Sequence, residues 1–377
     1  MKGMVRYRNH AAVVIVFAAV CVLSFFFVPA TRATLEKAQV LDAMVPGQLA
    51  ALAPEPLAPL EYPKEPRVLY VTSAIAGSGK MDGVIGLIKD SRGIFAPNAV
   101  VVDIQDETGK VSITDRTRAL VRRLRFLHIF PIARLVVFQN DSLAAEHPEW
   151  AIHAEGGALW RDHGGRHWLD ASHKEAWEHV AGVAREAAEA GFGEINFDYF
   201  RFPSEGITTA VYPFWRPNAS TTKTDVINDA ARYLKSGVKG KYPDVRVSAD
   251  IFGYTFMRER DLGIGQSAPA LAAIFDDICP MIYPSHFDAG NFNFDNPAAH
   301  PYEVMLGTLE TGKGIFAKAG QPFTNIRPWI QDFNLGATYT PQMVQDQMKA
   351  IGDAGLSAGW LIWNPSNKYR AEIFEES

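Results

Sequence analysis

The chain of 377 residues contains very little cysteine, with Cys21 and Cys279 as its two examples. Cys21 lies in an apolar N-terminal segment, so the rest of the chain holds one cysteine and cannot close an internal disulfide. The stability of the folded protein must therefore come from its hydrophobic core. Cys279 has no obvious base beside it in the run DDICPMIYP, and we expect it to be a buried structural thiol rather than a nucleophile.

The sequence also lacks an excess of positive charge. Its 37 Lys and Arg residues against 42 Asp and Glu residues give a formal net charge of −5. Binding to nucleic-acid phosphates requires a basic surface, so we expect no nucleic-acid partner. The hydrophobic content of 47% is that of a globular protein with a large core, and the charge balance favours neutral or weakly charged substrates.

Several motifs that would indicate other chemistry are missing. The chain has no G-x-S-x-G elbow and no H-E-x-x-H metal motif. The stretch AGSGK at residues 76–80 lacks both the first glycine of a phosphate-binding loop and the Ser or Thr that should follow its lysine. His153, His163 and His167 do not have the spacing of a zinc site. We therefore expect no cofactor and no metal.

The N-terminal residues have the pattern of an export signal. Basic residues precede an uninterrupted apolar stretch at residues 11–30, and small residues follow it in VPATRAT. Twenty apolar residues can also span a bilayer, so residues 1–33 are either a cleaved signal peptide or a membrane anchor. The expected location is periplasmic or extracellular, with a possible tether to the inner membrane through residues 11–30.

Two further segments follow this signal. Residues 34–66 are rich in Pro and Ala and predict a linker. Residues 67–377 contain eight short β-branched or aromatic runs, which start at residues 67, 99, 134, 194, 246, 277, 325 and 358. The segments between them have helical spacing, for example at His173–Ala190 and Thr340–Gly355, each followed or closed by a glycine. This alternation predicts one (β/α)₈ TIM barrel.

Polar side chains gather at the carboxyl ends of seven of these eight runs. They are Asp103, Gln105 and Asp106; Gln139, Asn140 and Asp141; Asp198 and Arg201; Asp250; Tyr283, Ser285 and His286; Gln331 and Asp332; and Trp363 and Asn364. Each of them could be a helix cap or a turn residue. The carboxyl ends of barrel strands meet at one mouth, so the repetition at seven ends favours an active site there.

Asp198 and Asp250 are the strongest catalytic candidates. Asp198 lies among aromatics in EINFDYFRFPSEG, and Arg201 three residues later could keep it ionised, or could form a purely structural ion pair with it. Asp250 occupies a similar apolar run on the next strand. Two carboxyls on adjacent strands fall within the range of about 5 to 9 Å that glycosidases use. One can then stay ionised while the other holds a proton.

Tryptophans support sugar chemistry. The loop after the third run contains Trp150, Trp160 and Trp168 among glycines and polar residues, and Trp329 and Trp363 lie near other strand ends. Indole faces pack on the C–H faces of sugar rings, while nearby polar groups bind hydroxyls. The loop tryptophans could alternatively pin a long loop to the barrel.

Six ordered motifs resemble a known family. VVVDIQDETG, GEINFDYFRFPSEG, VSADIFGYT, ICPMIYPSHF, IRPWIQDF and GWLIWNPSNKY look like those of a glycoside hydrolase family long catalogued as a domain of unknown function. The resemblance covers about residues 67–374 and implies a carbohydrate-active barrel distantly similar to α-amylase-type enzymes. It implies that Asp198 matches their fourth-strand nucleophile. Asp250 matches their fifth-strand acid/base, where those barrels have a glutamate, and Asp277 and His286 are reserve candidates.

Together these observations predict an exported, monomeric glycoside hydrolase that acts on an envelope or extracellular poly- or oligosaccharide. Asp198 and Asp250 are its expected catalytic residues. The expected substrate-binding residues are Asp103, Arg201, Tyr283, His286, Gln331, Trp160, Trp363 and Asn364. Two alternatives remain open: a glycan-binding barrel without catalysis, and a metal-dependent carbohydrate deacetylase that uses Asp103, Asp106 and loop histidines.

Overall fold

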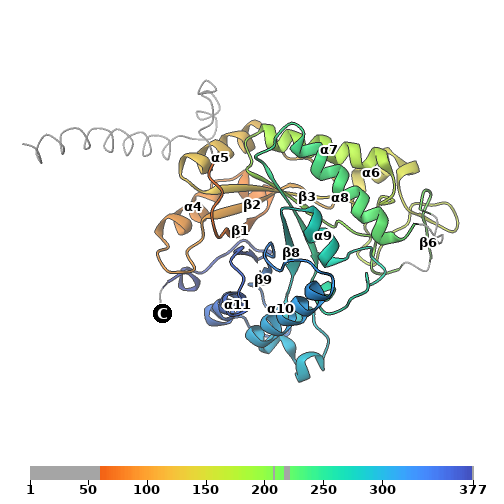
Figure 1. Cartoon of the computed structure of the whole chain (residues 1–377). Coiled ribbons are helices and arrows are strands. Elements are labelled where there is room, and N and C mark those ends of the chain that lie inside the picture. Colours follow the sequence, from red (N-terminus) through yellow and green to blue (C-terminus); the bar gives the residue numbers. More distant parts are fainter. Residues whose placement is uncertain (1–59, 207–208, 216–220, 376–377) are drawn as a thin grey trace, which may run out of the picture. The chain divides into compact units, whose positions relative to one another are not determined.

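A closed barrel of eight parallel strands forms the centre of the protein (Figure 1). The computed structural model describes residues 60–206, 209–215 and 221–375. Around the barrel the strand order is β1-β10-β9-β8-β7-β5-β3-β2, which confirms the predicted (β/α)₈ fold. The barrel strands are β1 (Arg67–Val71), β2 (Ala99–Gln105), β3 (Phe130–Val136), β5 (Glu194–Asp198), β7 (Arg246–Phe252), β8 (Asp277–Met281), β9 (Trp329–Gln331) and β10 (Trp360–Trp363).

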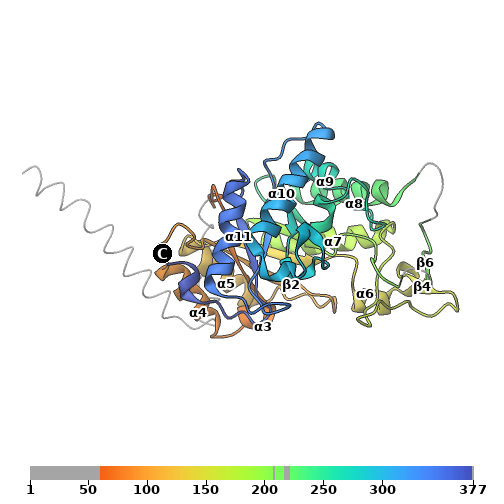
Figure 2. The same cartoon turned by 90° about the horizontal axis from the view of Figure 1, so that it is seen from below.

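Helices cover the outside of the barrel (Figures 1 and 2). They are α3 (Ser73–Ala76), α4 (Met81–Asp90), α5 (Asp115–Phe126), α6 (Asp141–Glu146), α7 (Lys174–Glu189), α8 (Lys223–Lys239), α9 (Ala268–Ile274), α10 (Pro301–Lys318) and α11 (Pro341–Asp353). Short 3₁₀ turns lie at Pro148–Trp150, Gly253–Phe256, Pro284–His286, Asn291–Asn293, Pro297–Ala299 and Ala371–Ile373. A small antiparallel pair, β4 (His153–Ala154) and β6 (Ala210–Val211), lies outside the barrel on the side of α6.

The two helices expected from their spacing are present. α7 and α11 end within two residues of the predicted segments, and Gly191 and Gly355 follow them with left-handed φ values of 102° and 78°. The side chain of Thr340 caps α11 by accepting a hydrogen bond from the backbone N–H of Met343 at 3.2 Å. Helix ends are therefore set by local sequence here.

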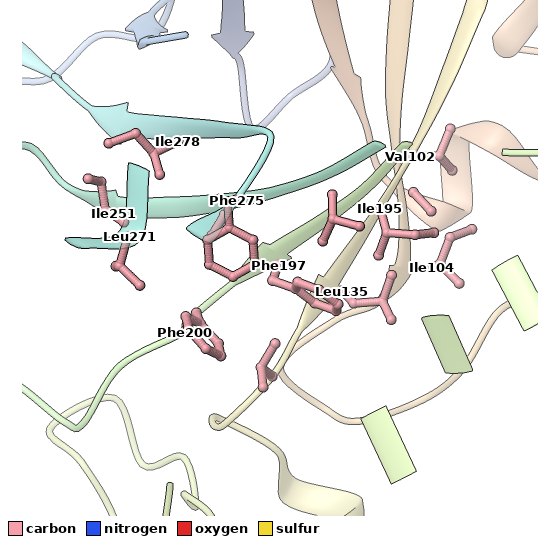
Figure 3. Close-up of a cluster of buried hydrophobic side chains, with 14 of the residues drawn as sticks. Val102, Ile104, Leu135, Ile195, Phe197, Phe200, Ile251, Leu271, Phe275 and Ile278 are labelled. Carbon is pink, nitrogen blue, oxygen red and sulfur yellow. The ribbon is translucent and has the colours of Figure 1, made fainter. Parts of the chain in front are cut away.

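The main hydrophobic core lies between the strands and the helices. Strand side chains alternate in direction, so Ile195 and Phe197 of β5 point outward and are fully buried against the helical layer (Figure 3). Leu271 of α9 and Phe275 pack in the same cluster. The intervening residues of β5 point into the barrel.

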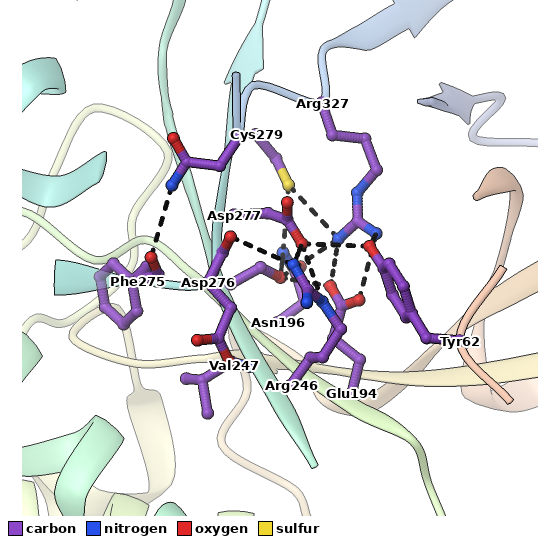
Figure 4. A network of polar contacts seen from close by, with 12 residues as sticks. Tyr62, Glu194, Asn196, Arg246, Val247, Phe275, Asp276, Asp277, Cys279 and Arg327 are labelled. Carbon is purple, nitrogen blue, oxygen red and sulfur yellow. Dashed lines mark hydrogen bonds and ion pairs between the residues drawn. The ribbon is translucent and has the colours of Figure 1, made fainter. Parts of the chain in front are cut away.

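The inside of the barrel is half apolar and half polar. Apolar side chains from β1, β2, β3 and β10 predominate in one half, among them Val68, Val101, Ile132 and Leu361, beside the inward-facing pair of Asp103 and Arg134 near the carboxyl ends of the strands. The half formed by β5, β7 and β8 carries a buried polar network instead (Figure 4). Barrel interiors are usually filled by Val, Ile and Leu, so this polar half indicates that the barrel does more than pack.

Glu194 and Arg327 form the centre of the polar network. Both are fully buried and make an ion pair through Glu194 Oε1 and Arg327 Nη2, with a second hydrogen bond from Nη1 to Oε2 at 3.1 Å. The hydroxyl of Ser248 donates to Glu194 Oε1 at 2.6 Å. Asn196 Nδ2 donates to Ser248 Oγ at 3.1 Å and to Asp250 Oδ1 at 2.9 Å. The network therefore extends from the middle of the barrel to a predicted catalytic residue.

The last part of the predicted linker belongs to the folded barrel. The ring of Tyr62 packs edge-on against Phe130 at 5.3 Å between centroids, and its hydroxyl donates to Asp277 Oδ2 at 3.1 Å. Arg246 lies over the same ring at 4.1 Å. Residues 60–66 thus pack at the amino ends of β3, β7 and β8. The other linker residues and the predicted signal or anchor, including residues 11–30, lie outside the described residues.

Within residues 60–206, 209–215 and 221–375, no helix combines the length and the apolar character needed to cross a membrane.

Candidate active site

A cavity of about 780 Å³ opens at the carboxyl ends of the barrel strands. Six predicted site residues line it: Asp198, Arg201, Asp250, Tyr283, His286 and Trp363. Its lining also includes Tyr70, Arg134, Gln139, Asp162, Arg166, Trp168, Tyr199, Phe252, Tyr254 and Trp329. Both predicted catalytic carboxyls therefore share one cavity. It lies at the carboxyl end of the strands, where TIM-barrel enzymes have their active sites.

Arg134, not Arg201, neutralises Asp198. Arg134 projects from β3 and forms an ion pair with Asp198 through Nη2, and its Nε donates to Asp198 Oδ2 at 3.0 Å. Its Nη1 forms a second ion pair with Asp103 Oδ1 at 2.6 Å. The carboxylates of Asp103 and Asp198 raise the pKa of Arg134 well above its usual value against the opposing effect of burial, so the guanidinium stays charged.

The sequence-based expectation that Arg201 pairs with Asp198 is corrected by this arrangement. Arg201 makes no ion pair with any described residue, and it stacks instead on the rings of Phe252, Trp168 and Tyr199. The direction of its side chain explains the difference, because Arg201 lies beyond the end of β5, whereas Arg134 on the neighbouring strand β3 faces the inside of the barrel beside Asp198. A charged residue inside the apolar run RLVVFQND was the signal that could have identified Arg134.

Asp250 lies at the floor of the cavity with 1% of its surface exposed. Its Oδ1 accepts hydrogen bonds from Trp329 Nε1 at 2.7 Å and from Asn196 Nδ2 at 2.9 Å. Its Oδ2 has no hydrogen-bond partner among the described residues. Burial, and after it the charge of Asp198, raise the pKa of Asp250 well above the usual value of an aspartate.

The strand register makes Asp198 and Asp250 neighbours. In the parallel pair β5–β7, Phe197 lies opposite Ala249, and the next residue on each strand is the aspartate. Adjacent strands are about 4.8 Å apart. The site therefore combines one carboxylate held by a cation with one carboxyl whose surroundings favour the protonated form, which is the combination required for general acid catalysis beside a nucleophile or charge stabiliser.

The backbone at Tyr199 is held in a rare conformation next to Asp198. Tyr199 has a φ of 49°, which is uncommon for a residue other than glycine, and its N–H donates to Asp198 Oδ1 at 2.6 Å. Its ring meets Trp168 at 5.8 Å between centroids. Strained backbone of this kind concentrates at functional sites, and here it orients the carboxylate of Asp198.

Aromatic side chains form two sides of the cavity. Trp363 and Tyr283 lie together at 5.1 Å between ring centroids, next to His286, whose pKa is lowered by burial. Trp168 lies on another part of the lining, where its Nε1 donates to Asp162 Oδ2 at 2.8 Å. Flat apolar faces beside hydrogen-bonding groups suit a sugar ring.

Four predicted substrate-binding residues lie outside the cavity lining. Asp103 lies behind Arg134 and accepts a hydrogen bond from the hydroxyl of Tyr70 at 2.5 Å. The side chains of Gln331, Asn364 and Trp160 form hydrogen bonds within the protein. Gln331 bonds to Ser285 and Phe333, Asn364 to Asp332 and Lys368, and Trp160 to Gly206 and Thr209. The contacts of Trp160 join its loop to the segment between β5 and β6.

The reserve candidate Asp277 lies at the amino end of β8, away from the carboxyl-end cavity. It bonds to Tyr62 and forms an ion pair with Arg246 at 2.6 Å. Cys279 is fully buried, and burial raises its pKa, which agrees with a structural thiol. In the part of the chain that the structure describes, no three His, Cys, Asp or Glu side chains gather into a metal-binding group.

A family model described as "Putative glycosyl hydrolase domain" matches residues 68–369. The chain belongs to this family. Because the match spans nearly the whole barrel, the glycosyl hydrolase assignment covers the strands that carry Asp198 and Asp250, and it confirms the resemblance of the six motifs. The chain has no match among curated proteins.

Solved structures similar to this glycosyl hydrolase domain share its fold. An α-galactosidase from Thermus thermophilus is 16% identical with a TM-score of 0.50, and 89% of this chain and 65% of that chain are covered. An α-L-fucosidase from Paenibacillus thiaminolyticus is 13% identical with a TM-score of 0.51, with 82% and 48% covered. The chain thus spans less than two thirds of the length of the first of these proteins and about half of the second. A hypothetical protein from Ruminiclostridium thermocellum is 29% identical over 48% of this chain and 96% of its own, with a TM-score of 0.41.

Proposed function

We propose that the protein hydrolyses glycosidic bonds of a poly- or oligosaccharide, with Asp250 as general acid and Asp198 as nucleophile or charge stabiliser. The observation that carries the proposal is the contrasting surroundings of two neighbouring carboxyls in one cavity. The family match supports the reaction class, and two of the similar structures are an α-galactosidase and an α-L-fucosidase.

The hydrogen bonds of Asp250 favour a proton on its Oδ2 atom. Two N–H donors, from Trp329 and Asn196, point at Oδ1, so the proton belongs on Oδ2, which has no described partner. In hydrolysis this proton passes to the glycosidic oxygen as the bond to the leaving sugar breaks. Asp198, paired with Arg134, then faces the positive charge that develops on the remaining sugar or forms a bond to its anomeric carbon. A water molecule then attacks that carbon, releases the sugar with a new hydroxyl group and returns a proton to Asp250.

Two isosteric substitutions test these roles. Asp198→Asn and Asp250→Asn each should lower kcat on a cleaved glycan by about 100- to 10,000-fold. An aryl glycoside with a good leaving group needs no acid for departure, so the Asp250→Asn enzyme should regain the first step on it, whereas the Asp198→Asn enzyme should not. Full activity of both variants on the natural glycan would sink the proposal.

The second candidate is a glycan-binding barrel without catalysis. Low exposure favours it: Asp198 is 5% and Asp250 1% exposed, and both oxygens of Asp198 already accept hydrogen bonds from Arg134 and Tyr199. A binding protein of this kind would hold an oligosaccharide with the same affinity in the wild type and in the Asp250→Asn variant, and would release no reducing ends with either.

We further propose that the protein is exported and acts as a monomer on a glycan of the cell envelope or the extracellular space. The basic residues followed by the apolar stretch at residues 11–30 support export. Cell fractionation with mass spectrometry of the mature N-terminus tests this, because a cleaved signal would start the chain near residue 31 or 34, whereas a membrane tether would leave the apolar stretch intact. Recovery of the full chain in the cytosol would contradict export.

A further inference from the structure

The cavity contains a buried cation that makes no ion pair with a described residue. Arg201 is 7% exposed and lines the same cavity as Asp198 and Asp250. Its guanidinium lies over the rings of Phe252 at 4.4 Å and Trp168 at 4.9 Å, measured to the ring centroids. These faces hold the group in a fixed plane and attract its positive charge.

Most of the hydrogen-bonding capacity of Arg201 is unused. A guanidinium has five N–H donors. Nη1 donates to the carbonyl of Phe202 at 3.1 Å and reaches the hydroxyl of Ser204 at 3.5 Å, and the side chain makes no other hydrogen bond to a described residue. Burial lowers the pKa of Arg201 in spite of the attraction of nearby acids. A buried charge of this kind is usually paired.

The acids nearest to Arg201 already have other partners. Asp162 accepts hydrogen bonds from Gln139 at 2.7 Å and from Trp168 at 2.8 Å. Glu205 pairs with His163 at 3.1 Å, and Asp198 pairs with Arg134. The other guanidinium near the cavity rim, that of Arg166, is also occupied, by Asp141 at 2.7 Å and Glu107 at 3.2 Å. Arg201 is therefore the cation of this lining that is left to a ligand.

We propose that Arg201 binds a carboxylate of the substrate, so that the enzyme acts on an acidic glycan that contains uronic acid residues. This inference rests on the proposed function for the place of the site, and it replaces the expectation of a neutral or weakly charged substrate with that of an acidic one. A planar guanidinium fork matches the two oxygens of a carboxylate. The ring faces of Phe252 and Trp168 keep the fork in position.

Paired polysaccharides provide the test. Polygalacturonate, alginate and hyaluronan are each compared with their carboxyl-reduced forms, which differ in charge but keep the sugar chain. Binding to the full-length protein is measured by calorimetry, and hydrolysis is measured by release of reducing ends. We expect the wild type to prefer the acidic form of at least one pair by about 10- to 100-fold, the size of a charged hydrogen bond. A lack of preference in all three pairs overturns the proposal.

Variants then assign the preference to one residue. Arg201→Gln should abolish the ratio between acidic and reduced forms, and Arg201→Lys, which keeps the charge but not the fork, should retain part of it. Arg118→Gln removes the same charge from a paired cation on α5, outside the cavity lining, and should leave the ratio unchanged. The ratio does not depend on the fraction of folded protein. If Arg201→Gln lowers binding of both forms equally, the proposal fails. Acid-selective binding without hydrolysis would support this inference and reject the proposed hydrolase function.

Discussion

At the scale of single residues, Asp198 and Asp250 show how two identical side chains acquire different roles. Asp198 faces Arg134, whereas Asp250 faces two neutral N–H donors and is removed from water. A cation stabilises the anion, and burial stabilises the neutral acid. The difference comes from neighbours on β3, β5 and β9, of which Arg134 and Trp329 are far from both aspartates in the sequence.

Replacing Asp250 by asparagine should stabilise the protein increasingly as the pH rises. The raised pKa means that folding binds a proton on Asp250, so wild-type stability from this group is present below the pKa of an unfolded aspartate, about 3.9, and is lost as the pH rises through the folded pKa. Asparagine does not titrate. Urea unfolding at pH 4 and pH 8 should show a larger gain at pH 8, and an equal gain at both would contradict the shift.

Replacing Arg134 by glutamine should destabilise the protein by about 3–5 kcal/mol, because Asp103 and Asp198 would be left as buried, unpaired charges. Adding Asp103→Asn should recover part of the loss. Arg166→Gln serves as the control, since that half-exposed pair should contribute less than about 1 kcal/mol. Urea unfolding measures all three variants, and equal losses for Arg134→Gln and Arg166→Gln would show that the buried pairs carry no special weight.

The sequence predicted which residues lie at the cavity more often than it predicted the side-chain partners of those residues. The strand-end pattern located Asp198, Asp250, Tyr283 and His286 at the cavity. It could not choose the partner of Asp198, because sequence proximity favours Arg201 whereas barrel closure brings β3 beside β5. It also could not show that Gln331 turns toward protein groups.

At the scale of elements, the alternation of apolar runs and helical segments was enough to predict all eight strands of the barrel. Boundaries were harder: the third strand begins at Phe130, four residues before the predicted run, and the seventh is short, Trp329–Gln331. The third strand contains Pro131 and the approach to the seventh contains Pro328, which obscure strand patterns in a sequence. The tertiary pairing of these strands overrides the local pattern.

The turn before β10 depends on a glycine for two reasons. Gly359 has a φ of 80°, and an added Cβ would lie 2.0 Å from the carbonyl oxygen of Pro66. Gly355 has a similar φ of 78°, but open space surrounds its Cβ position. Gly355→Ala should therefore cost about 1–2 kcal/mol for the left-handed backbone, and Gly359→Ala should cost clearly more. Thermal unfolding compares the stability of the two variants. Equal destabilisation would mean that the backbone at Pro66 shifts readily to make room for the added Cβ.

At the scale of the whole molecule, residues 60–66, which precede the first strand, pack against the barrel. The Pro-rich composition of residues 60–66 predicted a linker. Composition does not show that Tyr62 contacts the surface formed by the amino ends of the strands in the folded barrel. Such contacts join residues more than 60 positions apart and leave no local pattern. Leu60 also approaches this surface, because Gly193 leaves room where a Cβ would lie 2.4 Å from it.

Tyr62→Ala should destabilise the barrel by about 3–5 kcal/mol, the usual cost of removing a packed aromatic ring. Tyr62→Phe keeps the ring and removes two hydrogen bonds of the hydroxyl, the one donated to Asp277 and the one accepted from Arg327, so it should cost about 1–3 kcal/mol. Denaturant unfolding of the full chain gives both values. If Tyr62→Ala were neutral, residues 60–66 would act as a linker after all.

The buried pair Glu194–Arg327 has a consequence for how this barrel can change over time. Either residue replaced alone leaves a bare charge in the middle of the protein, one hydrogen-bonded step from Ser248 and two from the Asn196 that holds Asp250. The two positions are 133 residues apart in the chain, yet a substitution at one of them requires a matching substitution at the other. In a set of aligned relatives we expect positions 194 and 327 to covary, with double replacements by apolar residues found only where the residue at position 250 has another support.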